Sequence, residues 1–104
     1  MRDLNKEEAA RMKESCEILS HFLSAHQFET IVTPVLESTE LFARKSGGEL
    51  VSKLYTFTDP EGRNVSLRPE FTSSVIRHFI ANQNGIPGVF RWQYCGPVFR
   101  YERS

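Results

Sequence analysis

Apolar residues recur at helical spacing near the start of the chain, within residues 5–26. They form one stripe, which is made of Met12, Cys16, Leu19, Phe22, Leu23 and His26. Asn5 precedes this stripe, and Glu8 lies three residues after Asn5, which is the spacing of a capping box. Glu7 and Glu8 also suit the positive end of a helix dipole. The pattern predicts an amphipathic helix over residues 5–26 with a single apolar face.

The next segments favour extended structure. Residues 29–37 (ETIVTPVLE) are rich in β-branched residues, and Pro34 among them has no N–H to give a sheet. This predicts an edge strand, a bulge or a contact between chains. Residues 53–68 alternate along two short runs on either side of the turn sequence DPEG, which predicts a β-hairpin. A short helical turn between these segments is expected to end at Gly47-Gly48.

The C-terminal part of the chain returns to a helix and then to strands. A helix is predicted over residues 71–83, with an apolar face made of Phe71, Val75, Ile76, Phe79 and Ile80. The sequence GIPG breaks this helix, and residues 89–95 and 98–103 are predicted to form two further strands. Repeated strand–helix–strand units are absent from this order, so we expect an antiparallel α+β fold.

Composition and charge limit the class of protein and the partners that this chain can have. The 104 residues suit one small domain, and 25% charged against 39% hydrophobic residues is typical of a soluble globular chain. No apolar run reaches the ~18–20 residues of a membrane span. The N-terminus lacks the apolar region of a signal peptide, so we expect a cytoplasmic protein without membrane contact. The 13 basic and 13 acidic residues cancel, which excludes this segment as the main docking face for a nucleic acid.

Cysteine and histidine usage predicts no metal site. Cys16 and Cys95 lie far apart in the sequence, with no CxxC or Cys/His spacing near either. Two reduced, partly buried thiols suit a cytosolic chain, although the sequence leaves a disulfide between them open. The histidines, His21, His26 and His78, are not arranged with carboxylates or cysteines as a ligand set.

The stretch LRPEFTSS, residues 67–74, carries the first candidate chemistry. A predicted strand runs into a helix there, and Glu70 and Thr72 stand where polar groups gather around ligands. The plainer interpretation is helix capping, with Thr72 as the N-cap and Glu70 as a partner of the helix dipole.

The stretch VFRYER, residues 98–103, carries the second. Arg100 and Glu102 share one face of an extended chain, so they project side by side. An arginine fork binds phosphate or carboxylate through two hydrogen bonds, and a neighbouring carboxylate can orient it. The alternative is a solvated strand face with a surface ion pair of little energetic value.

The order of these stretches resembles the opening of the catalytic domain of the histidyl-tRNA synthetases, which are class II aminoacyl-tRNA synthetases. The resemblance covers nearly the whole chain and rests on IVTPVLESTELFARKSG, YTFTDPEGRNVSLRPEFT and RWQYCGPVFRYER. It implies an α+β, antiparallel-sheet fragment of the class II catalytic core, with an N-terminal motif 1 helix. Within residues 1–104, it places motif 1 at about 5–37, the hairpin at 53–68, the helix at 71–83 and the start of motif 2 at 89–104.

The resemblance implies that the parent protein activates histidine with ATP, accompanied by Mg²⁺, and transfers it to tRNA(His). Arg100 matches the motif 2 arginine, a catalytic residue that touches the α-phosphate of ATP and the substrate carboxylate. Glu102 matches the position near the adenine amino group. Glu70 and Thr72 match positions that contact the α-ammonium group and neighbouring polar atoms of the amino acid. Pro34 matches the dimer-interface region of motif 1, so a homodimer is implied.

The sequence departs from the family pattern at three points. Phe71 stands where glycine is commoner, so it either crowds the pocket or packs the helix, and Ser104 replaces the usual proline. The rest of motif 2, motif 3, the histidine-recognition segments and the anticodon-binding domain lie outside these residues. The 104 residues alone are therefore expected to be inactive, with an unpaired strand edge near Ser104.

Two alternatives stay open. The regulatory subunit of ATP phosphoribosyltransferase, from histidine biosynthesis, shares this N-terminal fold without aminoacylation activity. A purely structural or dimerising module is the other, in which the apolar stripe and the Pro34 region serve self-association.

Overall fold

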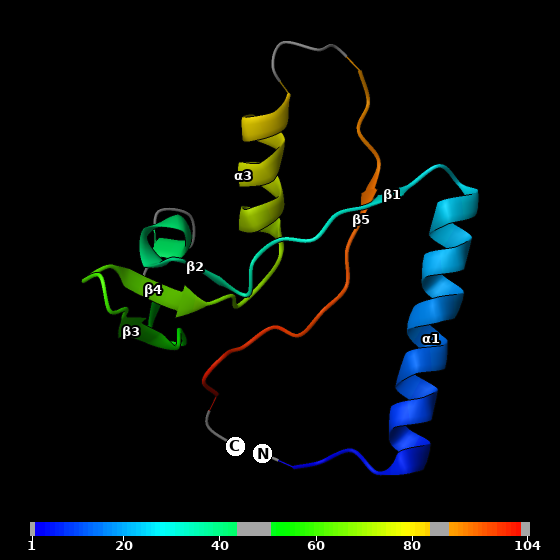
Figure 1. Cartoon of the computed structure of the whole chain (residues 1–104), viewed down its shortest axis with the longest axis horizontal. Helices are drawn as coiled ribbons and strands as arrows, with labels where there is room; N and C mark the ends of the chain where they lie inside the picture. The colour runs from blue at the N-terminus through cyan, green and yellow to red at the C-terminus, as the bar shows by residue number, and fades with distance from the viewer. Residues whose placement is uncertain (1, 44–50, 84–87, 103–104) are drawn as a thin grey trace. The chain divides into compact units, whose positions relative to one another are not determined.

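The computed structural model shows two units in the chain (Figure 1). The residues that it describes are 2–43, 51–83 and 88–102. The first unit joins Met1–Val32 to Gly88–Cys95, and the second joins Thr33–Pro87 to Gly96–Ser104. The length of the chain predicts one small domain, but the structure has two units. The second unit is distinct because the last segment of the chain is divided between the two. The first half of this segment pairs with the N-terminal unit, whereas its second half hydrogen-bonds to the hairpin of the other unit.

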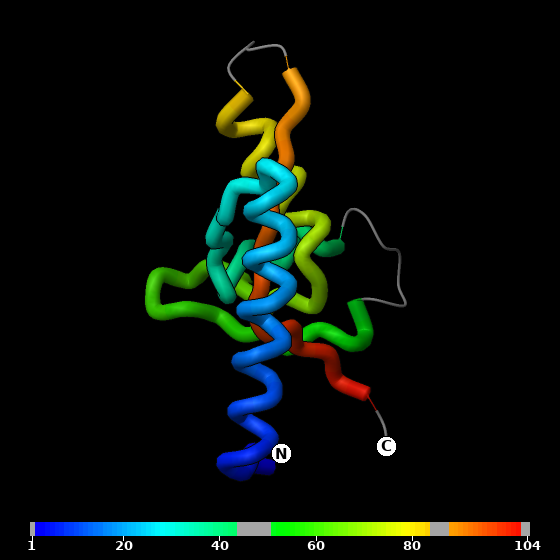
Figure 2. Tube along the Cα trace, turned by 90° about the vertical axis from the view of Figure 1, so that its right-hand side faces the viewer, coloured from blue at the N-terminus to red at the C-terminus, as the bar shows by residue number. Residues whose placement is uncertain are grey.

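Helix α1 (Lys6–Ala25) forms the body of the first unit and is continuous along its length (Figure 2). The predicted capping box is confirmed. The Asn5 side chain accepts a hydrogen bond from the Glu8 amide at 2.8 Å, and the Asn5 amide donates to the Glu8 carboxylate at 3.2 Å. Glu8 also pairs with Arg2 at 2.8 Å. At the other end, Gln27 has a left-handed φ of 69°, which turns the chain out of the helix.

The predicted apolar stripe of α1 is exposed within this unit. No residue of the helix is buried, and Met12, Leu19 and Phe22 are each more than half exposed, at 57%, 62% and 58%. The apolar side chains follow the helical period as predicted, but the described residues cover only Cys16 and Leu23 of the stripe, and these only in part. Helical spacing thus predicts the secondary structure correctly without specifying what packs against it.

Strands β1 (Glu29–Thr30) and β5 (Trp92–Gln93) pair in parallel, with Glu29 opposite Trp92. This pair is the one parallel pairing among the described strands, and it accompanies the antiparallel sheet of the second unit. A parallel pair requires a long connection, and Thr33–Pro87, the larger part of the second unit, lies between these strands in the sequence. Two side chains tie the pair to the end of α1. The Gln93 amide donates to Ser24 Oγ and to the Phe28 carbonyl, at 2.8 and 3.0 Å, and Arg91 donates to the His26 carbonyl.

The second unit is built on an antiparallel sheet in the order β2-β4-β3, so the α+β prediction is confirmed. The strands are β2 (Leu36–Ser38), β4 (Asn64–Leu67) and β3 (Thr56–Thr58). The predicted hairpin is β3 and β4, with shorter strands than residues 53–68 indicate. Its turn contains Gly62 at a φ of 82°, a conformation that favours glycine. The predicted extended segment around Pro34 joins this sheet only through β2.

Helix α3 (Thr72–Asn82) lies within one residue of its predicted bounds at each end. Its predicted apolar face is partly wrong, because Ile76 and Ile80 are exposed while Ser73 and Ser74 are buried. Residues 39–43 are also helical, and Phe42 in this segment is fully buried. The expected stop at Gly47-Gly48 lies outside the described residues.

The predicted strands at 89–95 and 98–103 are largely wrong. Only Trp92–Gln93 forms a strand in the first range, and described residues of the second form none. The second range is nevertheless anchored at alternate amides: the Phe99 amide donates to the Arg68 carbonyl at 2.9 Å, and the Tyr101 amide donates to the Lys53 carbonyl at 2.8 Å. This segment therefore runs along the ends of the hairpin without forming a ladder.

Candidate active site

Arg68 stands at the end of β4 and organises the segments around it. Its side chain is 5% exposed, its Nε donates to the Pro97 carbonyl at 2.9 Å, and its Nη1 donates to the Thr33 carbonyl at 3.1 Å. The guanidinium carbon also lies 4.5 Å from the centre of the Phe71 ring. Burying a charge is costly unless hydrogen bonds replace water, and these carbonyls and the ring face provide that replacement. Arg68 thereby holds the segment before Arg100 against the loop that carries Glu70.

Phe71 and Gly96 complete this packing. The ring of Phe71 stacks on the Arg68 guanidinium, so the departure from glycine at position 71 contributes to packing beside the site. Gly96 has a φ of 158°, and a Cβ there would collide with Nη2 of Arg68. The glycine is required because the backbone passes directly over the guanidinium.

Glu70 caps the start of α3. Both of its carboxylate oxygens lie within reach of the Ser73 amide, at 3.3 and 3.2 Å. The expectation that Glu70 partners the helix dipole is therefore confirmed. The expectation that Thr72 is the N-cap is wrong: Phe71 occupies that position without a side-chain hydrogen bond, and Thr72 is the first helical residue. The longer glutamate side chain reaches the amide from the preceding loop.

Arg100 lies beside this loop. Its Nε donates to the Pro69 carbonyl at 2.9 Å, immediately before Glu70 in the chain. Arg100 is exposed, and its two terminal amino groups have no hydrogen-bond partner among the described residues. One edge of the guanidinium is thus fixed by the protein, while the terminal fork remains available to an anion.

The structure brings Arg100 and Glu70 to the same loop, but it separates other predicted site residues from them. Glu102 lines a shallow pocket of about 420 Å³ together with Ser52, Lys53 and Tyr101. Pro34 is exposed and follows Thr33, whose carbonyl binds Arg68.

A larger hollow of about 770 Å³ lies over β2 and the hairpin turn and contains none of the predicted site residues. It is lined by Glu37 and Asp59, among others. Its position on the sheet, away from the Arg100 fork, makes it a poorer match to the predicted chemistry than the open fork beside Glu70.

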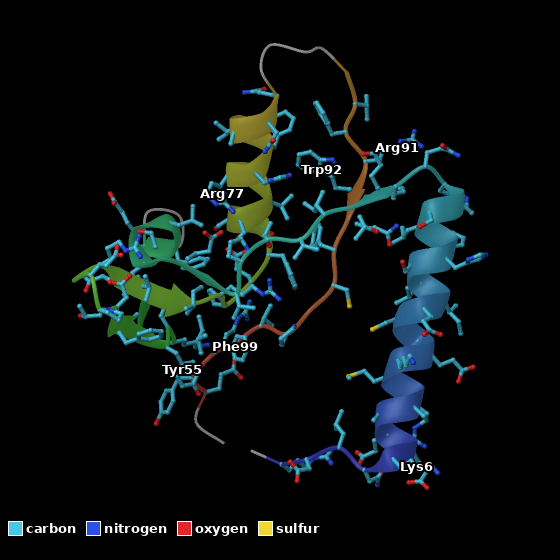
Figure 3. The ribbon with its side chains drawn as sticks, in the orientation of Figure 1. Lys6, Tyr55, Arg77, Arg91, Trp92 and Phe99 are labelled. Atoms are coloured by element: carbon cyan, nitrogen blue, oxygen red, sulfur yellow. The ribbon has the colours of Figure 1, made fainter. Side chains whose placement is uncertain are left out.

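Sequence reasoning missed the roles of Arg68 and of an ion pair between Glu37 and Arg77. Arg77 lies on α3 (Figure 3). It donates to Glu37 on β2 at 3.0 Å, and the glutamate side chain is only 9% exposed. No local pattern marks Arg68 as buried, because the carbonyls that it binds belong to Thr33 and Pro97. The Glu37–Arg77 pair spans forty positions, so no local pattern announces it.

Residues 2–43, 51–83 and 88–102 contain no group of three or more histidine, cysteine, aspartate or glutamate side chains arranged to hold a metal ion. Their helices include none that is long and apolar enough to cross a membrane.

Comparison with known proteins places these features in a family. The family model described as histidyl-tRNA synthetase matches residues 1–104. The chain is 41% identical over 101 residues to the histidine–tRNA ligase of Thermococcus kodakarensis, an alignment that covers 97% of this chain and 23% of the relative. The chain thus spans about a quarter of the length of such relatives.

Solved structures show the same likeness. Apo histidyl-tRNA synthetase from S. aureus superposes with a TM-score of 0.81 at 31% identity, covering 97% of this chain and 24% of that one. A Bacillus halodurans protein, described as an ATP phosphoribosyltransferase regulatory subunit/histidyl-tRNA synthetase, superposes with a TM-score of 0.85 at 25% identity. That alignment covers 99% of this chain and 27% of the other.

Proposed function

Because the chain belongs to the histidyl-tRNA synthetase family, we propose that it is the N-terminal part of the catalytic domain of a histidine–tRNA ligase. In this proposal, residues 5–37 correspond to motif 1 and residues 89–104 to the start of motif 2 of the class II fold. The parent protein activates histidine with ATP to form histidyl-adenylate and then transfers the histidyl group to tRNA(His).

The open fork of Arg100 is the observation that carries this proposal. Its Nε is held by the Pro69 carbonyl, which fixes the direction of the guanidinium before any ligand arrives. During activation, the histidine carboxylate attacks the α-phosphorus of ATP and pyrophosphate leaves, so negative charge builds on the α-phosphate oxygens. A guanidinium that is already positioned there stabilises this charge without reorganising in the transition state.

Glu70 supplies the complementary charge for the amino acid. The Ser73 amide is one donor, and the Glu70 carboxylate can accept several hydrogen bonds. Glu70 can therefore also accept from the α-ammonium group of histidine. Thr72, the first residue of α3, contacts neighbouring polar atoms of the amino acid. Glu102 contacts the adenine amino group of ATP. Mg²⁺ would accompany ATP and would neutralise part of the phosphate charge during activation.

We further propose that the parent protein is a cytoplasmic homodimer whose interface includes Pro34. Exposed apolar residues flank this proline, namely Val32 and Val35. Met12, Leu19 and Phe22 on α1 are also exposed, and they supply further apolar surface for contacts with other parts of the parent protein or with a second subunit.

The regulatory subunit of ATP phosphoribosyltransferase is the second candidate, favoured by the description of the B. halodurans structure. It has less support, because the curated relatives with the stronger sequence identity are histidine–tRNA ligases. Phe71 does not favour it either, since the ring packs on Arg68 within the loop.

Histidine- and ATP-dependent pyrophosphate exchange by the full-length parent protein tests the proposal. We expect exchange with histidine, and a loss of about 100-fold or more in Arg100→Gln, as found when one preorganised donor to a developing oxyanion is removed. Arg100→Lys should recover only part of this loss, because an ammonium cannot reproduce the fork.

Arg11→Gln is the matched control, since it removes an exposed arginine from α1. It should exchange at the wild-type rate. Absence of exchange with every amino acid would overturn the synthetase function and favour the regulatory subunit. The 104-residue chain by itself should show no exchange.

A further inference from the structure

The two cysteines of the chain meet in the first unit. Cys16 lies on α1 and Cys95 follows β5, and they are 79 positions apart in the sequence. Their Sγ atoms nevertheless lie 3.5 Å apart, and both are free thiols. A disulfide has an S–S length of about 2.05 Å, so a small rotation about the side-chain bonds would bring the atoms together.

Hydrogen bonds on one side of the pair hold this approach in place. Gln93, two residues before Cys95, is buried and donates to Ser24 on α1 and to the Phe28 carbonyl. The parallel pairing of β1 and β5 fixes the same segment from its other edge. The thiols are therefore neighbours because the fold aligns α1 with the segment after β5.

The pair is also accessible to reagents. It lies in an open groove of about 560 Å³ lined by Lys13, Cys16, Glu17, Ser20, His21, Ser24 and Cys95. Cys95 is exposed and Cys16 is half-buried, so Cys95 is the thiol that a small oxidant reaches first.

The neighbouring Cys95 affects the ionisation of Cys16. A hydrogen bond with Cys95 and the charge of its thiolate raise the pKa of Cys16 above the usual value for a cysteine. The raised pKa and half-buried position of Cys16 suit the resolving thiol, and the exposed position of Cys95 suits the attacking thiol.

We propose that Cys16 and Cys95 form a reversible disulfide when the protein meets a hydroperoxide. The Cys95 thiol loses its proton to solvent, and the thiolate attacks the peroxide oxygen. The O–O bond breaks to give a sulfenic acid, and with hydrogen peroxide the leaving hydroxide takes up a proton from solvent to form one water. Cys16 then attacks the sulfenic sulfur, its proton leaves with the hydroxyl group as a second water, and the S–S bond forms. Two thiols lose two electrons and two protons in total, and the peroxide is reduced to two waters.

The disulfide would join α1 covalently to the segment after β5. It would close a long loop of the unfolded chain, which stabilises the folded state relative to the unfolded one. A thiol reductant would reverse it by thiol–disulfide exchange.

Peroxide titration of the folded chain tests this inference. The chain is treated with increasing hydrogen peroxide, unfolded in urea, alkylated with iodoacetamide and analysed by mass spectrometry. We expect a species that is 2 Da lighter and unalkylated, with a linked Cys16–Cys95 peptide after digestion. It should form at roughly tenfold or more lower peroxide in folded than in urea-unfolded chain, because the fold supplies the proximity.

A double variant, Glu14→Cys with Cys16→Ser, is the matched control. It keeps two thiols at nearly the same sequence separation, but it moves one to the opposite side of α1 because position 14 lies about 200° around the helix from position 16. This variant should show no preference for disulfide formation in the folded state. Alkylation of both wild-type thiols after peroxide treatment, or equal sensitivity of folded and unfolded chain, would overturn the proposal.

Discussion

Both the backbone and the side chain of Arg68 form hydrogen bonds to the segments around it. Its amide donates to the Val35 carbonyl and its carbonyl accepts from the Phe99 amide, each at 2.9 Å. The guanidinium adds the bonds to Thr33 and Pro97. One residue therefore joins the segment around Pro34 to the segment that carries Arg100, which explains why an arginine is tolerated in a buried position.

Arg68→Gln should destabilise the chain by about 3 kcal/mol. The shorter amide cannot reach both carbonyls, and hydrogen bonds from a charged donor contribute about 1.5–3 kcal/mol each, with a further penalty for a buried acceptor left unpaired. The measurement is urea unfolding followed by circular dichroism. Arg11→Gln, at an exposed position of α1, should leave the midpoint unchanged. Equal midpoints for Arg68→Gln and the wild type would contradict the structural role.

Gly96→Ala should also destabilise the second unit, by about 1–3 kcal/mol, the usual cost of overpacking. The added methyl group would collide with the Arg68 guanidinium. Gly88→Ala is a close control, since Gly88 has a similar φ of 149° but open space around its Cβ position. The difference between the two variants in thermal unfolding isolates the collision from the backbone strain. Identical losses would show that Arg68 moves aside without cost.

At the scale of single elements, the hairpin turn is organised by Asp59. Its Oδ1 accepts from the amides of Glu61 and Arg63 at 3.0 and 2.8 Å, and its Oδ2 pairs with the Arg63 guanidinium at 2.7 Å. The hydrogen bond from the Arg63 amide is the main reason that the pKa of Asp59 lies below its usual value. The Arg63 guanidinium and the Glu61 amide lower this pKa further, and desolvation opposes them. The folded state therefore prefers the ionised carboxylate.

Asp59→Asn should remove an acid-sensitive part of the stability. A lowered folded pKa contributes stability that is fully present above the unfolded pKa and is lost as the pH falls through the folded value. The free energies of unfolding of wild type and variant should thus differ most near neutral pH and converge in strong acid. Urea titrations across this range provide the test. Glu61→Gln changes an exposed carboxylate of the same turn and should show no such convergence.

The elements also show what sequence can predict. The capping box at Asn5 and the turn at Asp59 depend on residues within a few positions, so local patterns identify them correctly. The parallel pairing of β1 with β5 and the burial of Ser73 in place of Ile76 depend on segments far away in the chain. Short strands carry too little local pattern to reveal their partners.

The same limit applies to the candidate site. Arg100 and Glu70 were identified from their motifs, and the structure places both at the loop after Arg68. The importance of Arg68 itself depends on carbonyls at Thr33 and Pro97, which lie about thirty positions away on either side. Sequence alone offers no means of finding such acceptors.

At the scale of the whole molecule, little apolar surface is buried among the described residues. Apart from Pro69, Phe42 is the one large apolar side chain of the described residues that is fully buried, whereas Val32 and Val89 are 88% and 86% exposed. Exposed apolar surface of this kind marks contacts with other chains or with further segments of the same chain.

The isolated chain should therefore self-associate. We expect its sedimentation coefficient to increase with concentration, because apolar side chains on α1 have no cover in one copy. Replacing Leu19 and Phe22 together by glutamine should shift the chain toward monomer. Glu14→Gln, on the polar side of the helix, should not. A monomer at every concentration would indicate that these side chains tolerate water in this chain.

The division of the last segment between the two units has one more consequence. Each unit is assembled from two separate stretches of chain, and the boundary at Cys95 and Gly96 lies in the middle of one short segment. No single cut can release either unit as a continuous piece, since a cut after Pro87 removes β5 from one unit and the anchored residues Phe99 and Tyr101 from the other. The two halves of such a cut chain are therefore candidates for fragment complementation, in which a peptide beginning at Gly88 restores both units at once.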